Sequence, residues 1–162
     1  MSGYGIEYPH RRIFWCPPFE GRRMLTHDVG YHPPMNAAAA GKVYPEVAFT
    51  VDPGRVAAFR QVFHQREGVP TTFVTTAEFT VIPDIAADPE LGLDFSRILH
   101  GSQEYDFRRP LREGETLTIR SRIESIRSLG GNSFLTLLTE LIDPDGDVVC
   151  TARSGLIERA ET

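Results

Sequence analysis

The first 32 residues contain the side chains of this sequence best suited to bind a transition metal. One thiol and three imidazoles lie here, at His10, Cys16, His27 and His32. Zinc is commonly bound by such sulfur and nitrogen ligands. The spacing of these four residues matches no compact zinc-binding module, so they are weak candidates for a metal site. We therefore expect no cofactor.

Residues 1–42 also differ from the rest of the chain in composition. They are rich in proline and aromatic residues, and residues 37–41 end the segment like a linker. Disordered segments are poor in aromatic residues. This composition favours an extended arm, residues 1–42, that packs on the domain or on a second subunit over a disordered tail.

The C-terminal third of the chain reads as a set of strands. Residues 98–111 open the set. Apolar residues alternate with polar ones over residues 115–127 and 147–159, and residues 133–143 are apolar at both odd and even positions. Alternation is typical of a half-covered strand, and apolar residues at both parities are typical of a central one. Turn residues separate the segments, at 112–114, 130–132 and 144–146. Short turns join antiparallel neighbours, so we expect a four-stranded meander.

The elements that must cover this sheet lie between residues 44 and 83. Residues 44–51 alternate like a strand, and Asp52 and Pro53 then mark a helix start that runs to Gly68. Residues 70–83 are ambiguous. Apolar residues alternate over residues 73–81 and five threonines favour a strand, whereas Phe73, Ala77 and Val81 also form one helical stripe.

Composition limits the classes of protein. The 162 residues suffice for one domain. A net charge of −5 and scattered basic residues argue against a nucleic-acid partner. No run approaches the roughly 20 apolar residues of a membrane span, and no signal peptide is evident. Cys16 and Cys150 form no CxxC pair, which favours two free thiols over a bridge and a cytoplasmic location.

A family resemblance rests on residues 99–114, which read Leu-His-Gly-Ser-Gln-Glu-Tyr-Asp-Phe-Arg-Arg-Pro-Leu-Arg-Glu-Gly. They resemble the N-terminal dehydratase domain of the MaoC-like family, which usually reads His-Gly-Glu-Gln, a strand and an Arg-Pro-Leu…Gly turn. Ser102 replaces the usual Glu. Residues 70–73 are similar to the family's Pro-Pro-Thr-Phe, and the resemblance covers roughly residues 43–159.

The resemblance implies an α+β hot-dog fold, in which a curved antiparallel sheet wraps round a central helix. It places that helix at residues 70–83, and burial against a sheet can override strand propensity. We therefore expect a helix there, in a single domain over residues 43–162. The family also pairs two hot-dog units side by side, so a homodimer or a heterodimer is expected.

Catalytic relatives in this family carry an Asp and a His in a Gly-Asp-x-Asn-Pro-x-His loop before the central helix. Adding water to an enoyl thioester needs a base for the water and an acid for the α-carbon. The corresponding segment here, residues 64–69, has no such pair. His64 and Glu67 are weak catalytic candidates, and a solvated helix end is the simpler interpretation.

Some members lack the pair and shape the acyl pocket of a catalytic partner, and this chain is similar to them. The candidate substrate-binding residues are Phe73, His100, Gly101, Gln103, Arg108 and Arg109. The arginines could meet a phosphate of coenzyme A or of an acyl carrier. Four of these candidates also have a structural interpretation. Phe73 would belong to the core, His100 would be a structural histidine at the start of a strand, and the two arginines would lie at a solvated strand end.

Three functions follow from the resemblance. The first is an accessory or substrate-binding subunit of an (R)-specific enoyl-thioester hydratase or 3-hydroxyacyl-thioester dehydratase. The second is a non-catalytic acyl-thioester-binding or structural hot-dog protein. The third is a self-sufficient hydratase with a divergent site. In each, the ligand is an acyl-CoA or acyl-carrier thioester, and whether this chain is itself an enzyme stays open.

Overall fold

A computed structural model describes residues 35–160, and the metal candidates His10, Cys16, His27 and His32 lie outside this range. Two α-helices and five strands make up the described chain. Their bounds are β1 Val47–Thr50, α1 Pro53–Phe63, α2 Thr75–Ala86, β2 Ile98–Phe107, β3 Thr116–Leu129, β4 Asn132–Ile142 and β5 Val148–Glu158. Short 3-10 helices lie at Ala37–Ala39, Thr71–Val74 and Phe95–Arg97. None of the described helices is long and apolar enough to cross a membrane.

Helix α1 begins where the sequence predicts. The Asp52 side chain accepts a hydrogen bond of 2.7 Å from the Arg55 amide, and Pro53 occupies the first helical turn. This side chain satisfies one of the amides that a helix start leaves free. The helix ends at His64, which adopts a left-handed conformation with φ 52°.

The ambiguous segment 70–83 is helical, as the resemblance implies. A 3-10 turn over Thr71–Val74 leads directly into α2. The hydroxyls of Thr75, Thr76 and Thr80 donate to backbone carbonyls three residues earlier, at 2.6–2.7 Å. The residues that α2 buries lie on one stripe, at Ala77, Glu78, Val81 and Ile85. Burial of this stripe outweighs the strand propensity of threonine.

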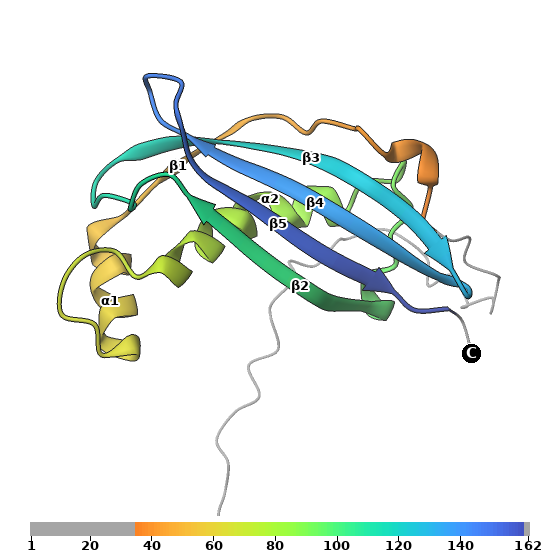
Figure 1. The fold of residues 1–162 in the computed structure, drawn as a ribbon, viewed down its shortest axis with the longest axis horizontal. Helices are drawn as coiled ribbons and strands as arrows, with labels where there is room; N and C mark the ends of the chain where they lie inside the picture. The colour runs from red at the N-terminus through yellow and green to blue at the C-terminus, as the bar shows by residue number, and fades with distance from the viewer. Residues whose placement is uncertain (1–34, 161–162) are drawn as a thin grey trace, which may run out of the picture. The chain divides into compact units, whose positions relative to one another are not determined.

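All five strands form one antiparallel sheet in the order β1-β3-β4-β5-β2, curved over α2 (Figure 1). The core lies between sheet and helix, where Phe73, Leu117 and Leu135 are almost fully buried. The doubly apolar segment 133–143 is indeed the central strand. This is the hot-dog fold expected from the resemblance.

The expected meander is wrong at its first turn. Residues 112–114 connect β2 to β3, yet these strands are not neighbours. One edge of β3 pairs with β4 and the other with β1, for example Phe49 opposite Leu117. Strand β2 therefore pairs with β5, with Tyr105 opposite Ala152, and no strand within residues 35–160 pairs with its other edge, which is called the free edge of β2 below. The strand order therefore contains a crossover between β2 and β3, which a simple meander lacks.

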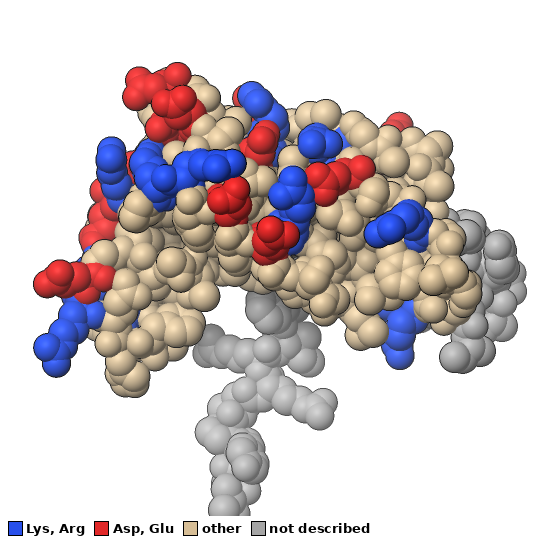
Figure 2. All heavy atoms as spheres, in the orientation of Figure 1, with Lys and Arg blue, Asp and Glu red and all other residues tan. Residues whose placement is uncertain are grey.

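The outer face of the sheet is charged but not strongly of one sign. Figure 2 shows Lys and Arg side chains interspersed with Asp and Glu over this face. Two arginines form ion pairs across it, Arg120 with Glu46 at 2.8 Å and Arg153 with Glu124 at 3.2 Å. A mixed surface of this kind is typical of a solvated sheet face and offers no basic patch.

Candidate functional site

A cavity of about 370 Å³ lies between α2, β2 and the end of β5. Its volume is in the range of roughly 300–1,000 Å³ typical of small-molecule sites. Helix α2 and strand β2 contribute most of its lining. The lining residues are Thr75, Glu78, Phe79, Ile82, Phe95, Ile98, His100, Gln103, Tyr105, Leu137, Ser154 and Leu156.

A β-bulge in β2 brings the two polar residues of the His-Gly-x-Gln motif to the same side. The register shifts between His100 and Ser102, so Gly101 is the extra residue. Before the bulge Ile98 and His100 line the cavity, and after it Gln103 and Tyr105 do. Without the extra residue, positions 100 and 103 would face opposite sides of the strand. The His100 Nε2 atom instead lies 3.1 Å from Gln103 Oε1.

Glycine suits the bulge because the strands approach closely there. A side chain at Gly101 would begin 3.1 Å from Ile157 Cδ1, and one at Gly155 would overlap Ser102 Oγ. A larger residue at Gly101 would therefore require the Ile157 side chain to shift. It acts on the cavity by setting the direction of its neighbours.

The polar centre of the cavity is Glu78, a side chain that the sequence analysis does not single out. The residue is only 3% exposed. Its Oε2 accepts a hydrogen bond of 2.5 Å from the Tyr105 hydroxyl. Its Oε1 lies 2.7 Å from Ser154 Oγ and accepts a bond of 3.3 Å from Gln103 Nε2. Helix α2, β2 and β5 therefore meet at one carboxyl group.

This environment fixes the protonation of Tyr105. Burial, followed by the hydrogen bond to Glu78, raises the pKa of the Tyr105 phenol above its ordinary value of about 10. The hydroxyl consequently keeps its proton and acts as a donor. Nearby, burial raises the pKa of the Cys150 thiol to about 12, with the Glu78 charge acting in the same direction.

The remaining predicted ligand contacts lie away from the cavity. Phe73 has no exposed area and packs edge-on against Phe59, with ring centroids 5.2 Å apart. Arg109 pairs with Glu115 at 2.9 Å and with Asp143 at 3.1 Å. The Arg108 side chain is 68% exposed, and its guanidinium lies 3.3 Å from Asp106.

The two weak catalytic candidates are also outside the cavity lining. His64 is the exposed residue that ends α1, and Glu67 is exposed three residues later. The backbone carbonyl of Glu67 accepts a bond from the Gln65 side chain at 2.7 Å. In the described structure these residues share a loop but no hydrogen bond joins their side chains.

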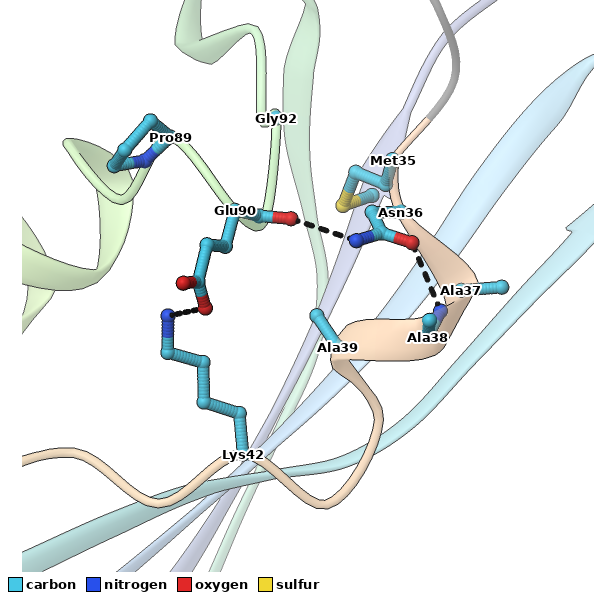
Figure 3. Close-up of a pocket in the computed structure, with 9 residues that line it drawn as sticks. All are labelled: Met35, Asn36, Ala37, Ala38, Ala39, Lys42, Pro89, Glu90 and Gly92. Atoms are coloured by element: carbon cyan, nitrogen blue, oxygen red, sulfur yellow. Dashed lines mark hydrogen bonds and ion pairs between the residues drawn. The ribbon is translucent and has the colours of Figure 1, made fainter.

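A second and larger hollow of about 830 Å³ lies beside residues 35–42 (Figure 3). Lys42 reaches Glu90 at 2.6 Å and Asp88 at 2.7 Å. The Asn36 side chain donates to the Glu90 carbonyl at 2.9 Å and accepts from the Ala38 amide at 3.0 Å. These contacts tie residues 35–42 to the loop after α2, which is a structural role. Residues 35–160 contain no cluster of side chains that could hold a metal ion.

The signals that could have revealed the Glu78 cluster are visible in the chain. Glu78 adjoins Ala77 on the buried stripe of the predicted helix. Ser154 lies on the inward-facing side of β5, between Ala152 and Leu156 on the same side. Polar residues at core positions usually meet one another or a ligand. The pairing of β2 with β5, which unites them, could not be read from either segment alone.

Comparison with known proteins agrees with the fold. The sequence profile of the FAS1-like, dehydratase domain region matches residues 40–152. A UPF0336 protein of Streptomyces griseus subsp. griseus is 38% identical over 64% of this chain and 69% of its own length.

Two solved structures share the architecture. A chain of the C-terminally truncated HadBC (3R-hydroxyacyl-ACP dehydratase) complex of Mycobacterium tuberculosis aligns with a TM-score of 0.63 at 21% identity, covering 74% of this chain and 96% of that one. A MaoC-like dehydratase aligns with a TM-score of 0.66 at 18% identity, covering 76% of this chain and 43% of that one. At these identities the likeness shows the fold. The profile match, which spans most of the chain, shows that it belongs to the FAS1-like dehydratase domain family.

Proposed function

We propose that this chain is the acyl-binding subunit of an (R)-specific enoyl-thioester hydratase or 3-hydroxyacyl-thioester dehydratase, and that its partner supplies the catalytic Asp/His pair. The observation that carries the proposal is the loop of residues 64–69 before the central helix. It holds neither an Asp nor the Asn-Pro-x-His sequence, and His64 and Glu67 are exposed there. Water addition needs a base and an acid within reach of the substrate.

The cavity supports binding of an acyl chain. Six of its twelve lining residues are apolar, and they include Phe79, Ile82 and Leu156. Transfer of methylene groups from water to such a lining is favourable by about 0.8 kcal/mol each. The thioester would be carried by coenzyme A or by a carrier protein. The exposed guanidinium of Arg108 is the proposed phosphate contact, since Arg109 is held by two carboxylates.

The free edge of β2 is the proposed contact with a partner subunit. It is ten residues long, whereas the opposite edge strand β1 has four. Unpaired strand edges readily pair with another chain. The HadBC chain that shares this fold comes from a complex. We propose that β2 pairs with a second hot-dog unit, either a dyad-bearing subunit or another copy of this chain.

Reconstitution tests this proposal. The chain is mixed with a MaoC-like subunit of the same genome that has the complete Asp/His pair, and enoyl-CoA hydration is followed by absorbance. We expect the mixture to be more active, or to accept longer chains, than the partner alone. His100→Ala should raise KM more than it lowers kcat, as expected where ground and transition states are bound alike. His64→Ala is the matched control and should leave both parameters unchanged.

A second candidate is a self-sufficient hydratase, and one observation favours it. Gln103 links His100 to Glu78 within the cavity, so an imidazole and a carboxyl line the same space. Hydration by the purified chain that is lost in both His100→Ala and Glu78→Gln would select this function. If no partner changes the rate and the chain alone is inactive, the remaining function is acyl-thioester binding without catalysis.

A further inference from the structure

A chain of hydrogen bonds runs from buried residues of the cavity lining to an exposed one. Glu78 and Ser154 are only 3% and 5% exposed, whereas His100 is exposed. Gln103 lies between them, because its amide contacts Glu78 Oε1 on one side and His100 Nε2 on the other. Glu78 therefore acts on the imidazole through the Gln103 amide.

The buried residues set the direction of this amide. Gln103 Nε2 donates to Glu78 Oε1 at 3.3 Å, and Gln103 Oε1 accepts from the Ser154 hydroxyl at 2.9 Å. In the reverse direction the amide oxygen would face the carboxyl oxygen, and two hydrogen-bond acceptors would oppose each other. The Tyr105 hydroxyl donates to the other carboxyl oxygen, Oε2, and holds the carboxyl in place. The amide oxygen of Gln103 is thus directed away from Glu78.

The direction of the amide determines which nitrogen of His100 carries the hydrogen. Gln103 Oε1 lies 3.1 Å from His100 Nε2, and an amide oxygen can only accept a hydrogen bond. Nε2 must therefore be the donor. A neutral imidazole has one donor and one acceptor nitrogen, so Nδ1 is the acceptor. Within residues 35–160 no side chain or backbone group forms a hydrogen bond with Nδ1.

We infer that Glu78 and Gln103 are positioning residues, which hold His100 in one tautomer and leave its Nδ1 atom as a proton acceptor in the cavity lining. The role of Nδ1 rests on the proposed function, whereas the tautomer does not depend on it. An acceptor nitrogen cannot donate to the thioester carbonyl or to a phosphate, because those oxygens also accept. Neutral His100 is thus unsuited to polarise the carbonyl and suited to receive a proton from the bound thioester or from a water molecule beside it.

The tautomer can be measured in the chain alone. The full chain is isotopically labelled at the histidine nitrogens, and two-bond proton–nitrogen correlation spectra are recorded at about pH 8.5, above the ordinary imidazole pKa of about 6.5. His100→Ala identifies the His100 signals. We expect Nε2 at the shift of a protonated nitrogen and Nδ1 at the shift of an unprotonated one. The opposite tautomer, or a mixture of both, would overturn the inference.

Two variants test whether Gln103 and Glu78 cause this preference. Gln103→Leu should move the two nitrogen shifts of His100 toward each other, because an imidazole without this hydrogen bond exchanges between its tautomers. Glu78→Gln should move them in the same direction by less, since the new amide can pair with either direction of the Gln103 amide. Glu104→Gln is the matched control at the exposed neighbour of Gln103 on β2, and should leave both shifts unchanged. Unchanged shifts in Gln103→Leu would overturn the positioning role.

The reconstituted complex tests the role of Nδ1 separately. Gln103→Leu should lower kcat/KM about fivefold, the usual size of one net hydrogen bond. In a His100→Ala background the same substitution should have almost no further effect, because it acts through His100. Equal losses in the two backgrounds would contradict action through the imidazole.

Failure of the inference and failure of the proposed function are distinguishable. If no partner changes the rate of hydration, the proposed function falls, and the spectra of the chain alone still decide the tautomer. If the spectra show a mixture of tautomers while the complex is active, the inference falls and the proposed function stands. Circular dichroism checks that each variant is folded, and Gln103→Leu carries the test if Glu78→Gln does not fold.

Discussion

One glycine determines which side chains of β2 reach the cavity. The bulge at Gly101 shifts the alternation of side chains along β2 by one residue. His100 and Gln103 therefore both line the space beside α2. The motif His-Gly-x-Gln thus has a geometric meaning. Its glycine permits a close strand contact, and its two polar residues reach a carboxyl on a distant element, Glu78.

The Cys150 thiol should be inert in the folded protein. Burial raises its pKa to about 12, and the residue has no exposed area. Only the thiolate reacts rapidly with electrophiles. In a Cys16→Ser background, alkylation by a maleimide at about pH 8 should be more than roughly a hundredfold slower in buffer than in urea. Equal rates in the two solvents would show that β5 opens readily.

Asp88 should make stability depend on pH. Its side chain accepts from Lys42 and Tyr44, and the Lys42 hydrogen bond above all lowers the pKa of this carboxyl. A carboxyl with a lowered pKa stabilises the fold above its unfolded value of about 3.9 and loses this effect as the pH falls below it. Asp88→Asn should therefore lower Tm at about pH 6, and by less at about pH 3.

The control for this prediction is Asp84→Asn. Asp84 is an exposed carboxyl near the end of α2. Its substitution should change Tm little at either pH. A Tm loss in Asp88→Asn that is the same at both pH values would contradict the assigned ion pair.

For individual residues, the sequence allows part of the site to be predicted. His100 and Gln103 follow from the family motif and line the cavity. Glu78, Tyr105 and Ser154 were not predicted, because their role arises only where three separate elements meet. Whether Phe73, Gly101, Arg108 or Arg109 touches a ligand stays a prediction.

Helix α2 shows how burial overrides local preference. Its threonine-rich first half favours a strand by propensity. The sheet receives an apolar stripe instead, and the threonine hydroxyls bond to the helix backbone.

Ala77 tests the packing between α2 and the sheet. This residue has no exposed area. Ala77→Leu forces three additional carbon atoms into a filled core, which should cost about 1–3 kcal/mol of unfolding free energy in urea titrations. Thr80→Ala, at an exposed position of the same helix, should change it by less than about 0.5 kcal/mol. If both variants were equally stable, α2 would not be packed as described.

Element types were easier to predict than their neighbours. The strands and α1 follow from alternation and from the Asp52-Pro53 start. The β2–β3 turn was misread as a hairpin, because a short connection between strands gives no sign that another strand already occupies the edge. A second bulge, at the start of β5, interrupts the alternation there, so that Val149 and Cys150 are both buried and Val148 only partly.

For the whole molecule, the free edge of β2 predicts association. Leu99 is 48% exposed on this strand, whereas Leu129 is 74% exposed at the end of β3. We expect light scattering at micromolar concentration to give the mass of a dimer. Leu99→Lys should weaken the dimer, since a charge on an edge strand opposes pairing. Leu129→Lys carries the same charge elsewhere and should not.

A monomer of 18.1 kDa under these conditions would contradict self-association. A larger species that forms when the dyad-bearing subunit is added to the unaltered chain, but not when it is added to Leu99→Lys, would then identify β2 as a heterodimer edge. If Leu129→Lys dissociated the dimer and Leu99→Lys did not, the contact would lie at the β3–β4 hairpin.

The rate of enoyl-CoA hydration by the purified chain alone tests the absence of a catalytic pair most directly. General acid and base groups each contribute about 10²–10⁴-fold. Without them the rate should stay near that of the buffer, and His64→Ala and Glu67→Ala should leave it unchanged. Rapid hydration by the single chain, lost in His64→Ala, would show that the loop of residues 64–69 is a divergent catalytic site.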